Sequence, residues 1–190
     1  MRAHHEMSGS GKEEQAFQCL PTQIRDKRGR FYQVRAFEAS DFEGLKEMYD
    51  AFEPKGTECG LPPPNDKVRL KWLCHVVTDL FSVLAIHKNR VVGHCALDLS
   101  CSPSCPEYLI FIRQEFRDRG LGTALSEVMK QLAEESGCEK VILTVRTANT
   151  RAVKVFEKTG FVFCGKIEAE RDMELPIECR RPALPRTSKN

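Results

Sequence analysis

The chain has 190 residues, and its apolar (41%) and charged (29%) fractions are those of an ordinary globular domain. No apolar run approaches the roughly 20 residues of a membrane span, and the polar N-terminus lacks the apolar core of a signal peptide. The net charge of +2 argues neither for nor against a polyanionic partner, and the nine scattered cysteines indicate reduced thiols in a cytoplasmic protein. We therefore expect neither nucleic acid nor a membrane among the partners.

The two ends of the chain are polar and aperiodic. Residues 1–28 are mixed in charge, and we expect them to form a flexible N-terminal tail. The basic segment 178–190 predicts a flexible C-terminal tail. Between them, residues 29–177 are long enough for one well-packed domain.

Strands and helices alternate in the first part of this domain. Ser40 and Glu43 have the spacing of a capping box and should begin a helix. The long Gly- and Pro-rich link 53–66 separates this helix from a second one. The helices are marked by apolar residues at helical spacing, Leu45, Met48, Tyr49 and Phe52 in one and Leu70, Leu73, Val77 and Leu80 in the other. The predicted strands are residues 30–36, 82–86 and 90–99, and Lys88-Asn89 is a hairpin-like turn between the last two.

The most informative stretch is the turn Arg117–Thr123, which follows an apolar strand-like run, Tyr108–Ile112. An amphipathic helix follows the turn, with Leu125, Val128, Met129, Leu132 and Ala133 on one face. This order places backbone N–H groups at the positive end of a helix dipole, where a phosphate binds well. Gly120 and Gly122 allow the backbone to approach a ligand closely. The turn predicts a site for a phosphorylated cofactor, although the two glycines alone are also compatible with a purely steric role.

A second element lies downstream. Residues 140–146 predict a buried strand, and Asn149 is a good N-cap for the helix that follows. Ala152, Val155 and Phe156 form the apolar stripe of this helix, and Gly160 is suited to its C-terminus. A closing hairpin is expected over residues 161–165 and 167–175.

Together the two segments resemble the cofactor-binding half of the GNAT superfamily of N-acetyltransferases. The residues that match its two motifs are Arg117, Gly120 and Gly122, then Asn149, Ala152, Glu157, Gly160 and Phe161. The resemblance covers residues 108–161 by identity and residues 31–177 by the order of elements. It implies an α/β, GNAT-like acyl-CoA N-acyltransferase fold, with a central mixed β-sheet flanked by helices in the order βααβββαβαββ. It also implies acetyl-CoA as co-substrate and no metal.

The resemblance implies a place for each part of the cofactor. A splay after the strand 108–112 exposes the backbone of Ile110, Phe111 and Ile112 to the thioester and the pantetheine arm, with the amide of Ile112 as oxyanion donor. Asn149 is expected to contact the pantetheine or nucleotide portion, and a plain helix cap is the alternative. The residues expected around the diphosphate are Arg117, Asp118, Arg119, Gly120, Leu121, Gly122 and Thr123, the last six through their amides.

Phe156 departs from the pattern of the superfamily. Many members have a tyrosine there, whose phenol protonates the thiolate of CoA, and phenylalanine has no proton to donate. Because a thiol with a pKa of ~8.5 leaves well as an anion, we expect catalysis to survive. Tyr108 and a water molecule are the alternative proton sources. The rival hypothesis is a catalytically silent module that binds acyl-CoA as a sensor.

A proton acceptor is needed as well, because an amine with a pKa of ~10.4 is protonated at neutral pH. Members of the superfamily often use a glutamate near the start of the strand that covers residues 108–112 here. Glu107 is nearest, but about one residue from the usual place, and a slip of one residue reverses the face of a strand. His94 is a second candidate if its strand points it into the cleft, and Glu115 is expected to be a surface charge. For each of these a structural role is the alternative.

His94 with Cys95, Cys101 and Cys105 also raises the question of a metal site. No Cys-x-x-Cys pair is present and Cys95 should face away from His94, so buried thiols explain them better. The resemblance implies that the link 53–66 walls the acceptor cleft, with an ordinary surface loop as the alternative. Its three acidic residues would tolerate a cationic amine.

We expect an acetyl-CoA-dependent N-acetyltransferase that acts by direct attack in a ternary complex. Its acceptor is a primary amine, either a small molecule or a protein lysine or N-terminus. The alternatives are the silent acyl-CoA sensor, a nucleotide-binding protein that uses the same turn, and an interaction domain. Both a monomer and a homodimer are compatible with the sequence.

Overall fold

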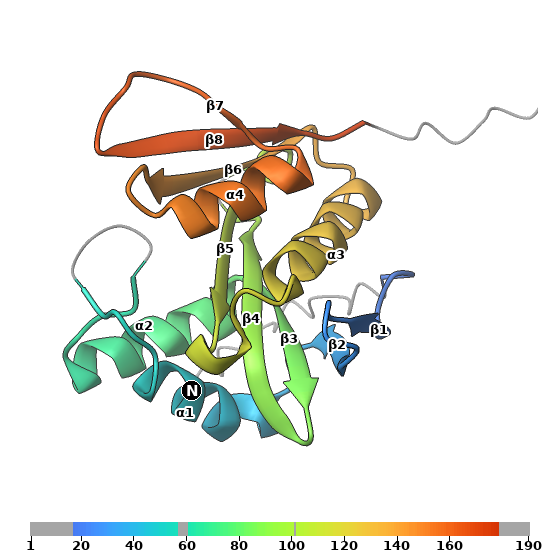
Figure 1. Cartoon of the computed structure of the whole chain (residues 1–190), viewed down its shortest axis with the longest axis vertical. Helices are drawn as coiled ribbons and strands as arrows, with labels where there is room; N and C mark the ends of the chain where they lie inside the picture. The colour runs from blue at the N-terminus through green and yellow to red at the C-terminus, as the bar shows by residue number, and fades with distance from the viewer. Residues whose placement is uncertain (1–16, 57–60, 101, 179–190) are drawn as a thin grey trace, which may run out of the picture.

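The computed structural model describes residues 17–56, 61–100 and 102–178, which form one eight-stranded sheet with helices on both faces (Figure 1). The strands lie in the order β1-β2-β3-β4-β5-β6-β8-β7. They are β1 Thr22–Arg25, β2 Phe31–Ala36, β3 Phe81–His87, β4 Arg90–Asp98, β5 Glu107–Ile112, β6 Lys140–Arg146, β7 Val162–Phe163 and β8 Glu170–Pro176. The helices are α1 Phe42–Asp50, α2 Asp66–Asp79, α3 Leu121–Glu135 and α4 Thr150–Thr159, with single 3₁₀ turns at Ala39–Asp41 and Gln114–Phe116.

The sheet is mixed. Neighbouring strands run antiparallel except for β5 and β6, which are parallel because α3 connects them as a crossover. The turn at Lys88 and Asn89 has φ values of 51° and 60°, as the two-residue hairpin between β3 and β4 requires. The predicted mixed α/β fold and the predicted order of elements are thus confirmed, with one additional strand at the start.

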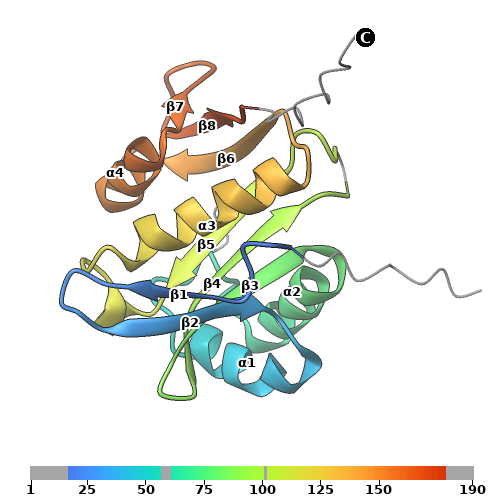
Figure 2. The same cartoon turned by 90° about the vertical axis from the view of Figure 1, so that its right-hand side faces the viewer.

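The two faces of the sheet bury separate cores. Alternate residues of β5 point to opposite faces, so Tyr108 packs in the core under α3 and α4 while Phe111 packs in the core over α1 and α2. Figure 2 shows α3 crossing one face of the sheet, with α1 and α2 against the other. Because β5 lies in the middle of the sheet, its residues reach both layers.

The prediction of a flexible tail over residues 1–28 is wrong for residues 17–28. Strand β1 pairs with β2, and the Asp26 carboxylate accepts hydrogen bonds from the Tyr32 hydroxyl at 2.7 Å and from the Arg28 and Arg30 amides at 2.8 and 2.9 Å. Phe17 is buried against Phe81, with ring centroids 4.6 Å apart. These contacts order a segment whose sequence is polar. The remainder of that tail and residues 179–190 of the other lie outside the described residues.

The capping box predicted at Ser40 is also wrong. Helix α1 begins at Phe42, after a 3₁₀ turn, and it is Asp41 whose carboxylate accepts from the Glu38 amide at 2.9 Å. The same carboxylate forms an ion pair with Arg35 at 2.6 Å. The helix therefore starts one residue later than a cap at Ser40 would place it.

No helix in the described ranges has the length and apolar character needed to cross a membrane. Among the same residues, no three His, Cys, Asp or Glu side chains are grouped so that they could hold a metal ion. Of the residues weighed as a metal site, Cys101 lies outside the described ranges. His94 and Cys95 face opposite cores, as their adjacent positions on a strand require.

Candidate active site

Strands β5 and β6 are joined at one end only. Glu107 lies opposite Ile142 in parallel register, and the Ile142 amide donates to the Pro106 carbonyl at 3.0 Å. Past that point the described residues of the two strands do not pair, and the strands diverge towards Ile112 and Arg146 (Figure 1). The structure thus has an opening in the sheet where the resemblance implied a splay.

The backbone of β5 faces this opening at alternate residues. The Arg113 amide donates to the Val92 carbonyl at 2.9 Å, which marks a hydrogen-bonded pair between the β4 and β5 chains. Because such pairs alternate along an antiparallel ladder, Ile110 and Ile112 direct their backbone groups away from β4. In agreement, the Ile112 carbonyl accepts from Nε of Arg117 at 3.0 Å. The amide of Ile112, the predicted oxyanion donor, and that of Ile110 therefore face the opening.

Two cavities meet at the opening. One has a volume of about 310 Å³ and extends towards α2; we call it the α2-side cavity. The other, of about 450 Å³, extends towards the start of α3; we call it the α3-side cavity. The residues that line both are Leu61, Ile110, Phe111, Arg146, Asn149, Ala152 and Phe156. The predicted site residues of β5 and α4 thus come together where the two cavities join.

A third cavity of about 460 Å³ adjoins the α3-side cavity and extends over the turn before α3; we call it the basic cavity. It shares with the α3-side cavity the residues Ile112, Arg117, Gly122, Arg151 and Val155. The three cavities therefore form one continuous run from α2, through the opening in the sheet, to the glycine-bearing turn.

The turn offers unpaired backbone amides. Asp118 and Gly120 have φ values of 58° and 87°, and α3 begins at Leu121. The first three amides of a helix have no partner within it, so those of Leu121 to Thr123 point out of the helix end. The Ala124 amide is the next one, and it donates to the Gly120 carbonyl at 3.0 Å. This geometry suits an anion.

Gly122 lies at the boundary between the α3-side and basic cavities. A Cβ atom at this position would lie 3.6 Å from Cγ2 of Val155, which is an ordinary contact. The fold alone therefore tolerates a methyl group at Gly122, whereas a larger side chain would extend into the cavities.

The side chain of Arg117 binds the protein itself. Nε donates to the Ile112 carbonyl and Nη2 to the Glu53 carbonyl, both at 3.0 Å, and the guanidinium lies 4.8 Å from the centre of the Phe52 ring. Burial lowers the pKa of this guanidinium from its ordinary value. Arg117 lines both adjoining cavities, but its donors join the end of β5 to the link after α1.

The other side chains of the turn differ in where they point. Asp118 forms an ion pair with Arg151 at 2.9 Å and lines the basic cavity, as does Thr123. The guanidinium of Arg119 lies 5.6 Å from the centre of the Phe116 ring, towards the β1–β2 hairpin. Leu121 is buried in the core. For Arg119 and Leu121, the backbone is therefore the part available to a cofactor.

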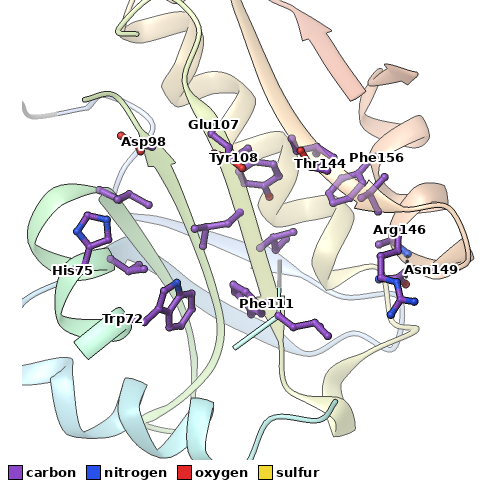
Figure 3. Close-up of a pocket in the computed structure, with 18 residues that line it drawn as sticks. Trp72, His75, Asp98, Glu107, Tyr108, Phe111, Thr144, Arg146, Asn149 and Phe156 are labelled. Carbon is purple, nitrogen blue, oxygen red and sulfur yellow. Dashed lines mark hydrogen bonds between the residues drawn. The ribbon is translucent and has the colours of Figure 1, made fainter. Parts of the chain in front are cut away.

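Asn149 and Phe156 stand on the α4 side of the opening (Figure 3). The Asn149 side chain accepts from the Ala152 amide at 3.2 Å, so the helix cap is real, and the residue also lines both cavities. Phe156 is 6% exposed and packs edge-on against Tyr108 and at a tilt against Phe161, with centroid distances of 6.3 and 5.6 Å. Its ring is part of the wall at the junction of the cavities.

The two acid–base candidates on β5 have different environments. Glu107 is exposed and lines the α2-side cavity, on the same face of β5 as Leu109 and Phe111. Tyr108 is buried, its hydroxyl lies 3.0 Å from Oγ of Ser126, and burial raises its pKa well above the usual value. A proton from Tyr108 would have to leave a buried hydrogen bond.

His94 does not point into the opening. It is fully buried against α1, with Nδ1 2.6 Å from the Tyr49 hydroxyl, and burial lowers its pKa to about 3. Its Nε2 has no hydrogen-bond partner in the described part of the chain. As a neutral, enclosed ring it is unsuited to take a proton from a substrate. Glu115 lies on the surface and pairs with Arg90 at 3.5 Å, as expected of a surface charge.

The α2-side cavity contains polar residues that the sequence analysis missed. Trp72 and His75 line it from α2, across from Phe156 and Asn149 (Figure 3). Nδ1 of His75 lies 2.5 Å from the Asp79 carboxylate, one helical turn further on. The remaining polar residues on the wall are Asp98, Thr144 and Arg146. The i, i+4 spacing of His75 and Asp79 is the one feature of the sequence that could have pointed to this part of the site. Only the fold shows that their helix faces the opening.

The comparisons with known proteins agree with this geometry. The model of the acetyltransferase (GNAT) family matches residues 45–161, more than half of the chain. A curated relative, the L-amino acid N-acetyltransferase AaaT of Escherichia coli, is 24% identical over 132 residues, which cover 67% of this chain and 81% of the relative. The mycothiol acetyltransferase of Corynebacterium aurimucosum is 41% identical over 54 residues, which are 28% of this chain and 18% of that longer protein.

Solved structures share the fold. The GNAT domain of S. lividans PAT superposes with a TM-score of 0.72 at 18% identity, over 82% of this chain and 96% of that domain. A phosphinothricin acetyltransferase from Sinorhizobium meliloti, solved in complex with AcCoA, superposes with a TM-score of 0.62 at 18% identity, over 77% of this chain and 88% of the other. At such identities the likeness shows the fold alone. With the match over residues 45–161, it follows that the chain belongs to the acetyltransferase (GNAT) family.

Proposed function

We propose that the protein transfers the acetyl group of acetyl-CoA to a primary amine, by direct attack in a ternary complex. The observation that carries this proposal is the continuous run of three cavities through the opening in the sheet. Acetyl-CoA has the same order of parts: phosphates for the turn before α3, a slender arm for the α3-side cavity, and a thioester for the junction. The α2-side cavity is then left for the amine.

At the junction, the thioester carbonyl would lie beside the exposed amides of β5. The tetrahedral intermediate carries an oxyanion, and a fixed amide donor there stabilises it more than it stabilises the substrate. Ile112 is the proposed donor. The carbonyl of the same residue is held by Arg117, which fixes the end of β5 next to this amide before any substrate binds.

Glu107 is the proposed proton acceptor, directly or through a water molecule. Its carboxylate lines the cavity assigned to the amine, and it stands opposite Asp98 on the neighbouring strand. The two carboxylates would make this end of the cavity attractive to a protonated amine. Loss of the proton to Glu107 would then give the neutral nucleophile.

For the leaving group, Phe156 supplies a wall but no proton. The CoA thiolate would leave as an anion, which a thiol pKa of ~8.5 allows. The same phenylalanine is the observation that favours the second candidate function, an acyl-CoA sensor without turnover.

The acceptor is a small molecule or a protein N-terminus or lysine side chain. One relative is named for L-amino acid N-acetylation, so L-amino acids belong in the first panel of acceptors, beside diamines and peptides.

Two measurements separate the possibilities. Calorimetry with acetyl-CoA should show saturable binding, and its absence would remove both candidates. Turnover with the amine panel, followed by release of free thiol, should then exceed the rate without enzyme. Binding without release of thiol for any amine would favour the sensor.

A further inference from the structure

The hairpin between β1 and β2 rests on the glycine-bearing turn. The Lys27 amide donates to the Arg119 carbonyl at 2.9 Å. The aliphatic stem of Lys27 covers Gly120, since a Cβ on that glycine would lie 3.3 Å from Cγ of the lysine. The position of Lys27 is therefore fixed by its backbone and its stem, and the residue is one of those that line the basic cavity.

The basic cavity takes its charge from several elements. Lys27 comes from the hairpin, Arg117 from the turn, and three more basic residues from one face of α4: Arg151, Lys154 and Lys158. They recur at helical spacing, so their side chains leave α4 on one side. Asp118 is the single carboxylate among the described lining residues, and it is paired with Arg151 at 2.9 Å.

The three lysines of this cavity have no carboxylate partner in the part of the chain that the structure describes. Some lysines elsewhere have one: Lys46, Lys55 and Lys140 pair with neighbouring carboxylates at 2.7, 3.1 and 2.9 Å. Like charges that line one cavity without a counter-charge raise its electrostatic potential. The cavity therefore favours an anion beyond the one that the amides of the turn accommodate.

We infer that Lys27, Lys154 and Lys158 bind the ribose 3′-phosphate of CoA, so that the protein discriminates CoA from its 3′-dephospho form. This inference rests on the proposed function, because it takes CoA as the occupant of the run of cavities. Coenzyme A carries two phosphate groups at separate places, the diphosphate and the 3′-phosphate. The amides of residues 121–123 suit the first, and the lysine cluster suits the second. Lys27 precedes the residues 45–161 that the family model matches, so this contact depends on the hairpin of this chain.

The test is calorimetric titration with CoA and with 3′-dephospho-CoA. For the unmodified protein we expect CoA to bind about 30-fold more tightly, as charge-assisted contacts to a dianion allow. Lys27→Met keeps an aliphatic stem over Gly120 and removes the charge. It should lower the affinity for CoA about fivefold and change the affinity for 3′-dephospho-CoA less than twofold. The double variant Lys154→Ala/Lys158→Ala should reduce the preference for CoA over 3′-dephospho-CoA further. Lys67→Ala on α2, far from the cavity, is the matched control and should change neither affinity.

Each result has one meaning. Discrimination that falls in the cavity variants and persists in Lys67→Ala supports the inference. Equal affinities of the unmodified protein for the two ligands, or variants that weaken both ligands to the same extent, overturn it and leave the proposed function intact. If the unmodified protein binds neither ligand, the proposed function fails, and this inference fails with it. Thermal unfolding of each variant identifies any loss of affinity that comes from loss of the fold.

Discussion

Replacing Phe156 with tyrosine tests the proposed handling of the leaving group. The ring is buried on the sides that face Tyr108 and Phe161, but it forms part of the wall where the α2-side and α3-side cavities meet. A phenol at this position would present its hydroxyl at the place assigned to the thioester. Phe156→Tyr should therefore add a proton donor to the thiolate.

The size of the effect follows from the leaving group and from the space. Loss or gain of a general acid changes rates by about 10²–10⁴-fold in general, and a thiol with a pKa of ~8.5 needs little help, so we expect kcat to rise about tenfold. The cavities have volumes of about 310 and 450 Å³, so one added oxygen atom has room. The change in the free energy of unfolding should stay below about 1 kcal/mol.

The assay is release of free thiol from acetyl-CoA with the best amine of the panel, from pH 6 to pH 10.5. The added rate should decline as the new phenol ionises, near pH ~10. Phe163→Tyr, on the short strand β7 and outside the three cavities, is the control for the addition of a hydroxyl. An unchanged kcat in Phe156→Tyr, with an intact fold and unchanged affinity for acetyl-CoA, would refute the reasoning that Phe156 stands where an acid would act.

Three further predictions concern the base, the turn and the core. Glu107→Gln should lower kcat/KM about 100-fold near neutral pH and less at high pH, where the amine is already neutral. The control Glu115→Gln should leave kcat/KM unchanged. If kcat/KM of Glu107→Gln equals that of the unmodified protein at every pH, Glu107 is not the base. Gly122→Val should lower the affinity for acetyl-CoA at least about tenfold with little change in Tm. Gly122→Ala should bind acetyl-CoA nearly as well as the unmodified protein, because its Cβ would lie at an ordinary 3.6 Å from Val155. Calorimetry measures the affinities, and thermal unfolding measures Tm. The low pKa of His94, about 3, means that the unfolded chain takes up a proton below pH ~6.5 while the folded chain does not, so the free energy of unfolding should fall by up to about 1.4 kcal/mol per pH unit between those values. Denaturant titrations from pH 7 to pH 4.5 should show a shallower fall in His94→Gln than in the unmodified protein, and equal slopes would contradict this account of His94.

The cofactor half of the fold could be predicted because its signals are local. Residues 108–161 contain a complete strand, turn and helix followed by a strand, cap and helix, and each boundary is marked within a few residues. Gly120 with its positive φ and Asn149 with its cap are examples of residues whose role depends on near neighbours.

Most of the misses depend on contacts between residues far apart in the chain. Residues 17–28 are ordered by the pairing of β1 with β2 and by contacts of Phe17, Gln18 and Cys19 with Phe81 and Glu135, which no local pattern reveals. In α2, Leu70 is one of the apolar residues that mark the helix in the sequence, but it is 41% exposed, and Arg69 takes the inward position. Its charge is held there by Asp50 and Asp66 at 2.6 and 2.9 Å, and the first of these belongs to another helix.

The candidate site shows the same division. Glycines and a cap predicted where the phosphates would bind, because those residues shape the backbone around them. The wall of the α2-side cavity is made of residues from α2, β4, β5, β6 and α4 and from the link after α1. Trp72 and His75 gain their place only from the packing of α2 on the sheet. The direction in which His94 points depends on the strand register and could not be read from its neighbours in the chain.

The guanidinium of Arg117 fastens the end of β5 to the link that follows α1. One of its bonds ends on the last carbonyl of β5, beside the proposed thioester position, and the other on the backbone of Glu53, between Phe52 and Pro54 in the wall of the α3-side cavity. The same link contributes Leu61 to the α2-side cavity, which is assigned to the amine. A ligand that shifts either attachment point also strains the other. By thermodynamic linkage, the factor by which bound acetyl-CoA changes the affinity for the amine equals the factor by which bound amine changes the affinity for acetyl-CoA. In the proposed function, Arg117 thus joins the places assigned to the two substrates before any chemistry takes place.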